Sequence, residues 1–170
     1  MRWPPIDITW RDTPRAEDAD AVRGIVASTG VFRADEVEVA VELLEVALRE
    51  GPSAGYHFLF AHPPGGDAAA APDAYACFGP IPCTVRRYDL YWIAVRGSCQ
   101  KRGLGQAVLA AALGRMAGLG AVRCFVETSG TAAYAPTRKF YERGGGRPVA
   151  RIADYYDAGD DLVVYAWEMA

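Results

Sequence analysis

In one segment of the chain, apolar residues recur with the period of an α-helix. The apolar positions lie on one face of a helix: Val37, Val41, Leu44 and Leu48. Asp35 is suited to accept hydrogen bonds from the first free amides of this helix, and Gly51, which is followed by a proline, is suited to end it. The pattern therefore predicts an amphipathic helix that covers one face of a core.

Short apolar runs between turn residues predict the other elements. Strands are expected over 6–10, 56–61, 74–79, 85–95, 122–128, 149–156 and 162–169, and further helices over 17–27, 103–119 and 137–143. The run 90–95 is almost entirely apolar, which is typical of a central strand covered on both faces. Because helix 103–119 joins two such strands, we expect a parallel crossover in a mixed sheet with helices packed on it. The Pro- and Gly-rich residues 62–73 are expected to form a surface hairpin loop rather than a linker between domains.

Length and composition narrow the class of protein. The chain has 170 residues, of which 51% are apolar and 23% charged, and this predicts one domain over residues 1–170. A net charge of −3 disfavours generic binding to nucleic acid. No apolar run is long enough for a membrane span and residues 1–5 lack the features of a signal peptide, so we expect a cytoplasmic protein. Four cysteines without CxxC spacing and two histidines predict reduced thiols and no metal site.

One junction combines the features of an anion site. The apolar run that ends at Val95 leads within a few residues to Gly103 and Gly105, where a helix is expected to begin. Amides in the first turn of a helix have no partner within it, and glycines remove side chains that would hold a phosphate away. Lys101 and Arg102 add positive charge beside the same spot. The pattern predicts a phosphate or pyrophosphate site, although turn geometry alone would also explain the glycines. The spacing matches neither the dinucleotide nor the P-loop motif.

The same residues resemble a known family. Gln100-x-x-Gly103-x-Gly105, after a strand that ends in Val95, is similar to the acyl-CoA signature of the GNAT superfamily of N-acetyltransferases. Residues 137–145 (TRKFYERGG) are similar to the family's A-x-x-x-Y-x-x-x-G helix, with Tyr141 at the tyrosine. The order of expected elements agrees along nearly all of the chain. The resemblance implies an α/β, GNAT-like fold with a mixed central sheet of about seven strands, about four flanking helices, and a parallel, splayed strand pair at the cofactor site.

The resemblance also implies how acetyl-CoA, the expected cosubstrate, is held. Backbone groups of Ile93 and Val95 would bind the pantetheine arm. Amides of the turn would bind the pyrophosphate: Gln100, Lys101, Arg102, Gly103, Leu104, Gly105 and Gln106. Tyr134 and Arg138 are placed among the cofactor contacts as well. Tyr134 stands where the family often has Asn, and whether it replaces that contact stays open.

Acid and base candidates follow from the chemistry of acyl transfer. By the resemblance, Tyr141 would be the general acid for the departing thiolate, while core packing is its ordinary alternative. A lysine-like amine must lose its proton before it attacks, which costs about 4.6 kcal/mol at pH 7, so a base is expected. Glu127 is the first candidate because open α/β sheets bind ligands at the carboxyl ends of their strands. Asp89 is the second candidate, and a surface carboxylate and a turn residue are the ordinary alternatives for the two.

Two further groups of polar residues have ordinary explanations. His57 is expected to be a core histidine with its hydrogen bonds satisfied. An acidic group near the C-terminus could attract a cationic acceptor, but such a group is more typical of a solvated hairpin turn: Asp154, Asp157, Asp160 and Asp161.

The expected function is an N-acetyltransferase that moves acetyl from acetyl-CoA to a primary amine by direct attack. Neither matched motif contains a cysteine, which favours direct transfer over a covalent enzyme intermediate. The alternative is a non-catalytic acyl-CoA-binding sensor or interaction module on the same fold, and a nucleotide-binding enzyme is a third option. The acceptor is expected to be a small-molecule or peptide amine of unknown identity, with no nucleic acid, membrane or metal involved. A homodimer through the terminal strands is compatible with the sequence.

Overall fold

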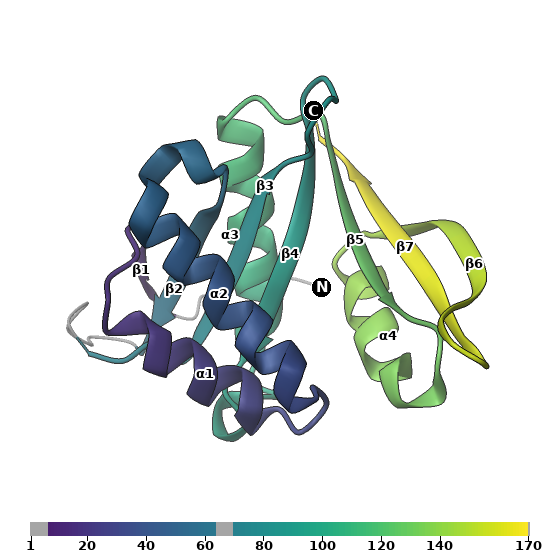
Figure 1. Cartoon of the computed structure of the whole chain (residues 1–170), viewed down its shortest axis with the longest axis horizontal. Coiled ribbons are helices and arrows are strands. Elements are labelled where there is room, and N and C mark those ends of the chain that lie inside the picture. Colours follow the sequence, from purple (N-terminus) through teal and green to yellow (C-terminus); the bar gives the residue numbers. More distant parts are fainter. Residues whose placement is uncertain (1–6, 64–69, 170) are drawn as a thin grey trace.

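A seven-stranded mixed sheet forms the centre of the protein (Figure 1). The computed structural model describes residues 7–63 and 70–169. The strands are β1 (Thr9–Arg11), β2 (His57–His62), β3 (Ala74–Pro80), β4 (Arg87–Val95), β5 (Arg123–Ser129), β6 (Arg147–Asp157) and β7 (Asp160–Glu168). They lie in the order β1-β2-β3-β4-β5-β7-β6, and every neighbouring pair is antiparallel except β4 and β5. The expected mixed sheet with one parallel pair is confirmed.

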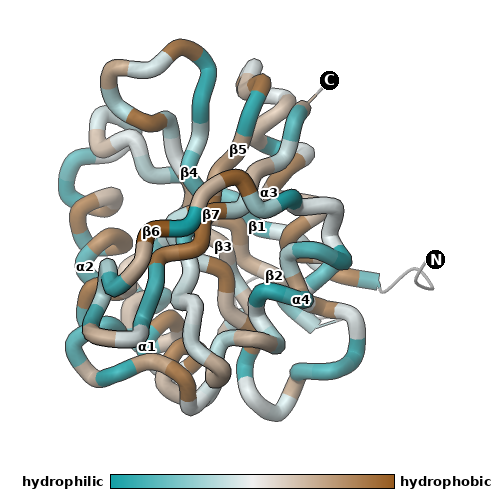
Figure 2. Tube along the Cα trace, turned by 90° about the vertical axis from the view of Figure 1, so that its right-hand side faces the viewer, coloured by the Kyte–Doolittle hydropathy of each residue, from teal (hydrophilic) through white to brown (hydrophobic). Residues whose placement is uncertain are grey.

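Helices cover both faces of the sheet, as the side view in Figure 2 shows. The helices are α1 (Asp18–Ser28), α2 (Ala34–Glu50), α3 (Leu104–Gly118) and α4 (Ala135–Arg143), with short 3₁₀ turns at Gly51–Ala54, Gly97–Cys99 and Ala132–Tyr134. Residues of α1 and α2 pack with β2 and β3 in one core cluster, and residues of α3 and α4 pack with β3, β4, β5 and β7 in a second cluster. The predicted order of helices and strands is therefore confirmed.

The apolar stripe of α2 faces the sheet as predicted, but its N-terminus differs from the prediction. Val37, Val41 and Leu44 are buried, whereas Leu48 is 40% exposed near the end of the helix. The residue before the helix is Arg33, not Asp35. The Glu36 side chain accepts a hydrogen bond from the Arg33 backbone N–H at 2.8 Å, which is half of a capping box. Asp35 lies inside the first turn and pairs with the Arg33 guanidinium instead.

A buried ion pair attaches the short edge strand β1 to α1. Two guanidinium nitrogens of Arg11 donate to the two carboxylate oxygens of Asp18 at 2.8 and 2.6 Å. Asp18 also accepts a hydrogen bond from the Arg15 backbone N–H, and the Arg11 guanidinium lies 4.4 Å from the centre of the Phe60 ring. Asp18 therefore does more than complement the helix dipole, because it is the counterion of a buried arginine.

The predicted hairpin between β2 and β3 is confirmed, and its first strand is longer than expected. β2 continues through His62, which is 2% exposed and pairs with Thr9 of β1, so His62 is a strand residue rather than the start of the surface loop. The centre of that loop, residues 64–69, and residue 6 of the predicted first strand lie outside the described residues.

The two parallel strands separate soon after they begin. Arg87–Asp89 of β4 pair with Arg123–Phe125 of β5, and beyond Asp89 the described part of β4 has no partner on this side. β4 continues along β3 as far as Val95, and β5 continues along β7 as far as Ser129. Figure 1 shows the two strands diverging. The predicted splayed pair is thus present, with an unpaired backbone edge on each side of the gap.

A β-bulge in β4 accompanies this separation. Cys77 of β3 pairs with Trp92 and Phe78 pairs with Leu90, so Tyr91 is an additional residue in β4. A bulge bends its strand and changes which face the following side chains occupy. Tyr91 and Trp92 consequently both pack toward the cluster of α1 and α2, whereas Ile93 packs toward α3.

Strand β6 forms the edge of the sheet opposite β1, and this edge is exposed to solvent. Every residue of β6 is exposed, and this strand would be available to pair with a second copy of the chain. The homodimer stays a prediction. Among the described residues, no helix is both long enough and apolar enough to span a bilayer.

Replacement of Asp18 should destabilise the protein strongly because Arg11 would remain buried without a counterion. We expect Asp18→Asn to lower the free energy of unfolding by about 3–5 kcal/mol, measured by urea denaturation at pH 7. Asp20 lies in the same helical turn with a side chain that is 97% exposed. Asp20→Asn should therefore change stability by less than about 0.5 kcal/mol. Equal effects of the two substitutions would show that only the helix dipole matters.

Candidate active site

The turn between β4 and α3 exposes a series of backbone N–H groups. Lys101 and Gly103 have φ values of 63° and 84°, so the chain turns through left-handed conformations before α3 begins at Leu104. After the Gln100 amide, the next backbone amide that donates to a protein acceptor is that of Ala107, which donates to the Gly103 carbonyl at 3.1 Å. Among the described residues, no acceptor faces the amides of residues 101–106. Free amides at the positive end of a helix form an anion site.

The side chains of this turn divide into free cations and structural contacts. Lys101 and Arg102 are exposed and form no ion pair within residues 7–63 and 70–169. The Gln100 side chain donates to the Val95 carbonyl at 3.1 Å and so closes the turn onto the end of β4. The Gln106 side chain donates to the Phe140 carbonyl at 2.9 Å, so it joins α3 to α4 and only its backbone N–H remains free.

Gly105 is required by packing, which corrects the sequence interpretation of this glycine. A Cβ at Gly105 would lie 3.1 Å from a ring carbon of Phe140 and 3.5 Å from a methyl carbon of Val95. The missing side chain therefore leaves room for α4 and β4 rather than for a phosphate. Gly103 remains the glycine whose left-handed conformation shapes the turn itself.

Tyr141 lies on α4, on the same side of the sheet as this turn. It is 5% exposed, and its ring packs against Tyr165 and Trp167 at centroid distances of 5.8 and 5.9 Å. Its hydroxyl has no hydrogen-bond partner among the described residues. Burial, with smaller contributions from Cys124 and Tyr134, raises the pKa of Tyr141 far above its ordinary value. Tyr141 therefore keeps its proton and can donate it.

Tyr134 and Arg138 hold the end of β5 in place. The Tyr134 hydroxyl donates to the Val31 carbonyl at 3.4 Å, which connects the segment before α4 to the loop between α1 and α2. The Arg138 guanidinium donates to the Ser129 and Thr131 carbonyls at 2.7 and 2.8 Å. Both side chains thus have partners within the protein, and their contacts with a cofactor stay predictions.

Two carboxylates face each other across the point where the strands separate. Asp89 is the last residue of β4 that pairs with β5, and Glu127 is two residues beyond its partner Phe125. Burial, followed by the charge of Glu127, raises the pKa of Asp89 to about 6. In the described part of the chain, neither carboxylate has a hydrogen bond or an ion pair. The structure therefore brings together the two base candidates, which lie far apart in the sequence.

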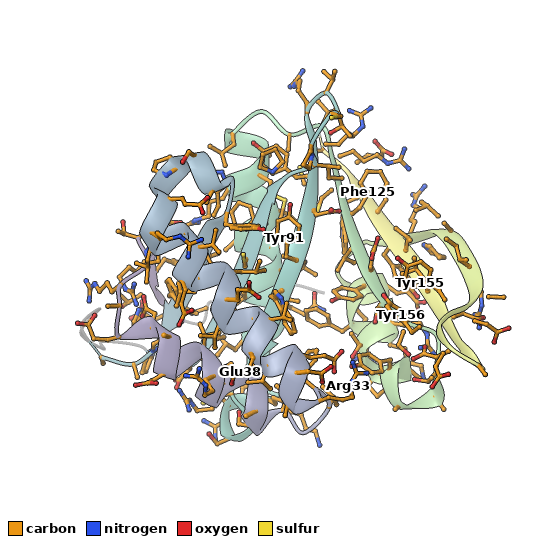
Figure 3. The ribbon with its side chains drawn as sticks, viewed as in Figure 1. Arg33, Glu38, Tyr91, Phe125, Tyr155 and Tyr156 are labelled. Carbon is orange, nitrogen blue, oxygen red and sulfur yellow. The ribbon has the colours of Figure 1, made fainter. Side chains whose placement is uncertain are left out.

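Aromatic side chains that the sequence did not single out line the same face. Figure 3 shows Tyr91 on one side of the gap and Phe125 and Tyr156 on the other. The charge of Asp89 helps to raise the pKa of Tyr91, and the charge of Glu127 helps to raise the pKa of Tyr156. Tyr91 follows Asp89 by two residues and shares its face through the ordinary alternation of a strand, and the bulge brings Trp92 to the same face. Tyr156 lies in an irregular stretch of β6 after Ile152, which hydrophobic periodicity does not predict.

His57 differs from the sequence expectation. It is half-buried, stacks on Phe78 at a centroid distance of 5.5 Å, and lines a hollow of about 810 Å³ between the C-terminal ends of α2 and α3. Burial lowers its pKa. This hollow contains none of the predicted site residues, so it lies apart from the candidate chemistry.

Comparisons with known proteins agree with this arrangement. A model of the acetyltransferase (GNAT) family matches residues 73–146. The chain is similar to a GNAT-family protein from Desulfovibrio desulfuricans, with 44% identity, a TM-score of 0.90, and coverage of 96% of this chain and 99% of that one. The chain belongs to the GNAT family of acetyltransferases. This confirms the family and the fold that the two motifs indicated.

More distant structures share the GNAT fold. A Salmonella typhimurium protein solved with its cofactor acetyl-CoA has 15% identity and a TM-score of 0.70, and covers 96% of this chain and 94% of its own. The PaiA N-acetyltransferase of Thermoplasma acidophilum, solved with coenzyme A, has 16% identity and a TM-score of 0.65, and covers 94% of this chain and 99% of its own. No curated protein matches the chain.

The environment of Asp89 predicts a stability that depends on pH. Because its pKa is raised to about 6 from an ordinary value near 4, ionisation disfavours the folded state. Stability should fall as the pH rises from about 4 to 6 and then stay level. Asp89→Asn should thus stabilise the protein at pH 8 by about 1–2 kcal/mol, a value reduced for partial exposure, and have no effect at pH 4.

Urea denaturation of the native protein and of Asp89→Asn at both pH values measures this difference. Glu42 is an exposed acid on α2, and Glu42→Gln serves as the control that should show no such dependence. The prediction would be contradicted if the difference in free energy of unfolding between the native protein and Asp89→Asn were the same at pH 4 and pH 8.

Proposed function

We propose that this GNAT protein is an acetyl-CoA-dependent N-acetyltransferase that acts on a primary amine by direct attack. The observation that carries the proposal is the position of the free amides of residues 101–106 beside the gap between β4 and β5. The amides supply a site for a diphosphate, and the gap supplies a passage to the carboxylates on the other face.

The chain's own groups suit coenzyme A. The free amides, together with unpaired Lys101 and Arg102, match a pyrophosphate and a further phosphate. The unpaired edge of β4 beyond Asp89 offers backbone groups to the amides of a pantetheine arm, in the manner of an added strand. Ile93 and Val95 lie on this edge, although the Val95 carbonyl already accepts from Gln100. When bound, acetyl-CoA supplies a thioester whose carbonyl carbon accepts the amine.

The two base candidates have different environments, which favour Asp89 over Glu127. Asp89 is half-buried and its pKa is raised to about 6, so it accepts a proton from an amine more readily than an ordinary carboxylate does. Glu127 is exposed, and its charge contributes to the raised pKa of Asp89. We assign Asp89 as the proton acceptor, directly or through water, and Glu127 as its electrostatic neighbour.

The reaction balances with these groups in place. The amine nitrogen forms a bond to the acetyl carbon as the carbon–sulfur bond breaks. The amine's proton passes to Asp89, and Tyr141 donates a proton to the departing thiolate. Cys124 is buried near Tyr141, and burial raises the pKa of its thiol to about 12. A thiol in that state is a poor nucleophile, which supports direct transfer rather than an acetyl-cysteine intermediate.

Gly103 should control coenzyme affinity through its left-handed conformation. A β-branched residue at φ of 84° is strained, so Gly103→Val should displace the free amides. We expect the Kd for coenzyme A, measured by calorimetry, to rise about tenfold or more. Gly114 has open space around it within α3, and Gly114→Ala should leave the Kd unchanged. An unchanged affinity for Gly103→Val would remove the main support for the coenzyme site.

Tyr141→Phe tests the proposed activity directly. Loss of the acid should lower kcat for amine acetylation, followed as release of free thiol, by about 100-fold, with the Kd for acetyl-CoA unchanged. Tyr75 is also buried with an unpartnered hydroxyl, but it lies in the other core cluster, so Tyr75→Phe should keep full activity. Unchanged turnover in Tyr141→Phe would refute the assigned acid. Binding of acetyl-CoA by the native protein without transfer to any amine would favour the non-catalytic module.

A further inference from the structure

We infer that the acceptor is a diamine, or an amine with a second positive charge, that lacks a carboxylate next to either charged nitrogen. This inference rests on the proposed acetyl transfer and names the substrate class of that same site. It depends on the face of the gap opposite the coenzyme turn, which we call the acceptor face and define by Asp89, Tyr91, Phe125, Glu127 and Tyr156.

The two carboxylates of the acceptor face lack partners. Asp89 and Glu127 repel each other, and within residues 7–63 and 70–169 no cation is paired with either. A half-buried carboxylate next to a second one is unfavourable unless a positive charge joins them. Across the gap, Tyr141 is 5% exposed, and its hydroxyl makes no hydrogen bond within the described part of the chain. Polar groups without partners thus approach the gap from both sides.

Aromatic rings surround these charges. Phe125 lies directly opposite Asp89 in the strand register, and Tyr91 lies two residues beyond Asp89 in β4. The Tyr156 ring packs edge-on against the Tyr155 ring at a centroid distance of 5.0 Å. The charge of Glu127 helps to raise the pKa of Tyr156, which indicates that the two side chains are close. The Arg123 guanidinium already lies 5.1 Å from the centre of the Phe125 ring. Tyr91 and Tyr156 are therefore the rings that can bind an ammonium group through cation–π contacts and pack along an aliphatic stem.

Much of the positive charge beside the acceptor face is paired with acids. Three arginines pair with acids: Arg33 with Asp35 at 3.1 Å, Arg123 with Glu168 at 3.0 Å, and Arg151 with Asp161. No lysine or arginine in the described residues is among the groups that shift the pKa of Asp89 or Tyr156. Arg87, two residues before Asp89 in β4, has no acid partner among the described residues, but it donates to the Val85 carbonyl and is not among the groups that shift the pKa of Asp89. An α-carboxylate beside Asp89 or Tyr156 would therefore meet acids and rings rather than a cation.

Asp89 and Glu127 would have different roles in acetyl transfer to a diamine. One must take the proton of the reacting nitrogen, and Asp89 is assigned to it. Glu127 lies close enough to Tyr156 to act on it, and a second ammonium group on the acceptor would pair with the Glu127 carboxylate. A monoamine would leave this charge without a partner in the complex, which lowers affinity.

Three amines of one chain length separate these effects. Cadaverine carries two amines, pentylamine carries one, and lysine is cadaverine with an α-carboxylate. We expect kcat/KM with acetyl-CoA for cadaverine to exceed that for pentylamine by about tenfold and that for lysine by more than tenfold. The KM for cadaverine should also rise more steeply with added NaCl than that for pentylamine.

Glu127→Gln tests the assignment of the second charge. The ratio of kcat/KM for cadaverine to that for pentylamine should fall to near one, and a ratio is insensitive to general damage to the protein. Glu17 is an exposed acid at the far end of α1, and Glu17→Gln should keep the native ratio. Asp89→Asn should instead lower kcat/KM for both amines.

The outcomes separate the two proposals. Thiol release with lysine or pentylamine at least as fast as with cadaverine would overturn the diamine inference and leave acetyl transfer intact. An unchanged ratio in Glu127→Gln would overturn the role of Glu127 in the same way. No release of thiol with any amine, despite binding of acetyl-CoA, would refute the proposed function itself.

Discussion

The early separation of β4 and β5 is the constraint on which the rest of this protein depends. Inside a sheet, each backbone N–H and C=O has a partner in the next strand, and burial of these groups without one is unfavourable. Here the two central strands pair over three residues, Arg87–Asp89 with Arg123–Phe125, and then diverge. The bulge at Tyr91 bends β4 away, while β5 stays with β7. The gap leaves polar backbone edges in the middle of the fold, where an extended ligand can satisfy them.

The gap divides the site into two faces of opposite charge. The turn that begins α3 presents free amides, Lys101 and Arg102, which favour an anion. The other face presents Asp89 and Glu127 among aromatic rings, which favour a cation. A reaction that joins a polyphosphate-bearing thioester to an amine needs this division, because each substrate then approaches the side that attracts it. Tyr141, which we propose as the acid, and Asp89, which we propose as the base, likewise lie on separate sides, so neither neutralises the other.

The carboxylates at the gap differ from the buried carboxylate of Asp18, which has a counterion. Arg11 and Asp18 are both buried and satisfy each other, so together they fix β1 to α1. Asp89 is half-buried beside another carboxylate, and the hydroxyl of Tyr141 is buried without a partner among the described residues. Such arrangements disfavour the folded state, and they are found where a protein binds a ligand or changes a charge.

Local patterns in the sequence determined much of this protein. Helical periodicity, apolar runs and the glycines around α3 predicted the order of elements and the anion site, because each depends on neighbours within a few residues. The motif around Tyr141 and the Gln100-x-x-Gly103-x-Gly105 motif indicated the family. Only the tertiary structure decided that Gly105 makes room for Phe140, and that Asp89 and Glu127 meet beside Tyr91 and Tyr156. These relations join segments that are dozens of residues apart in the sequence, so patterns within a few residues do not specify them.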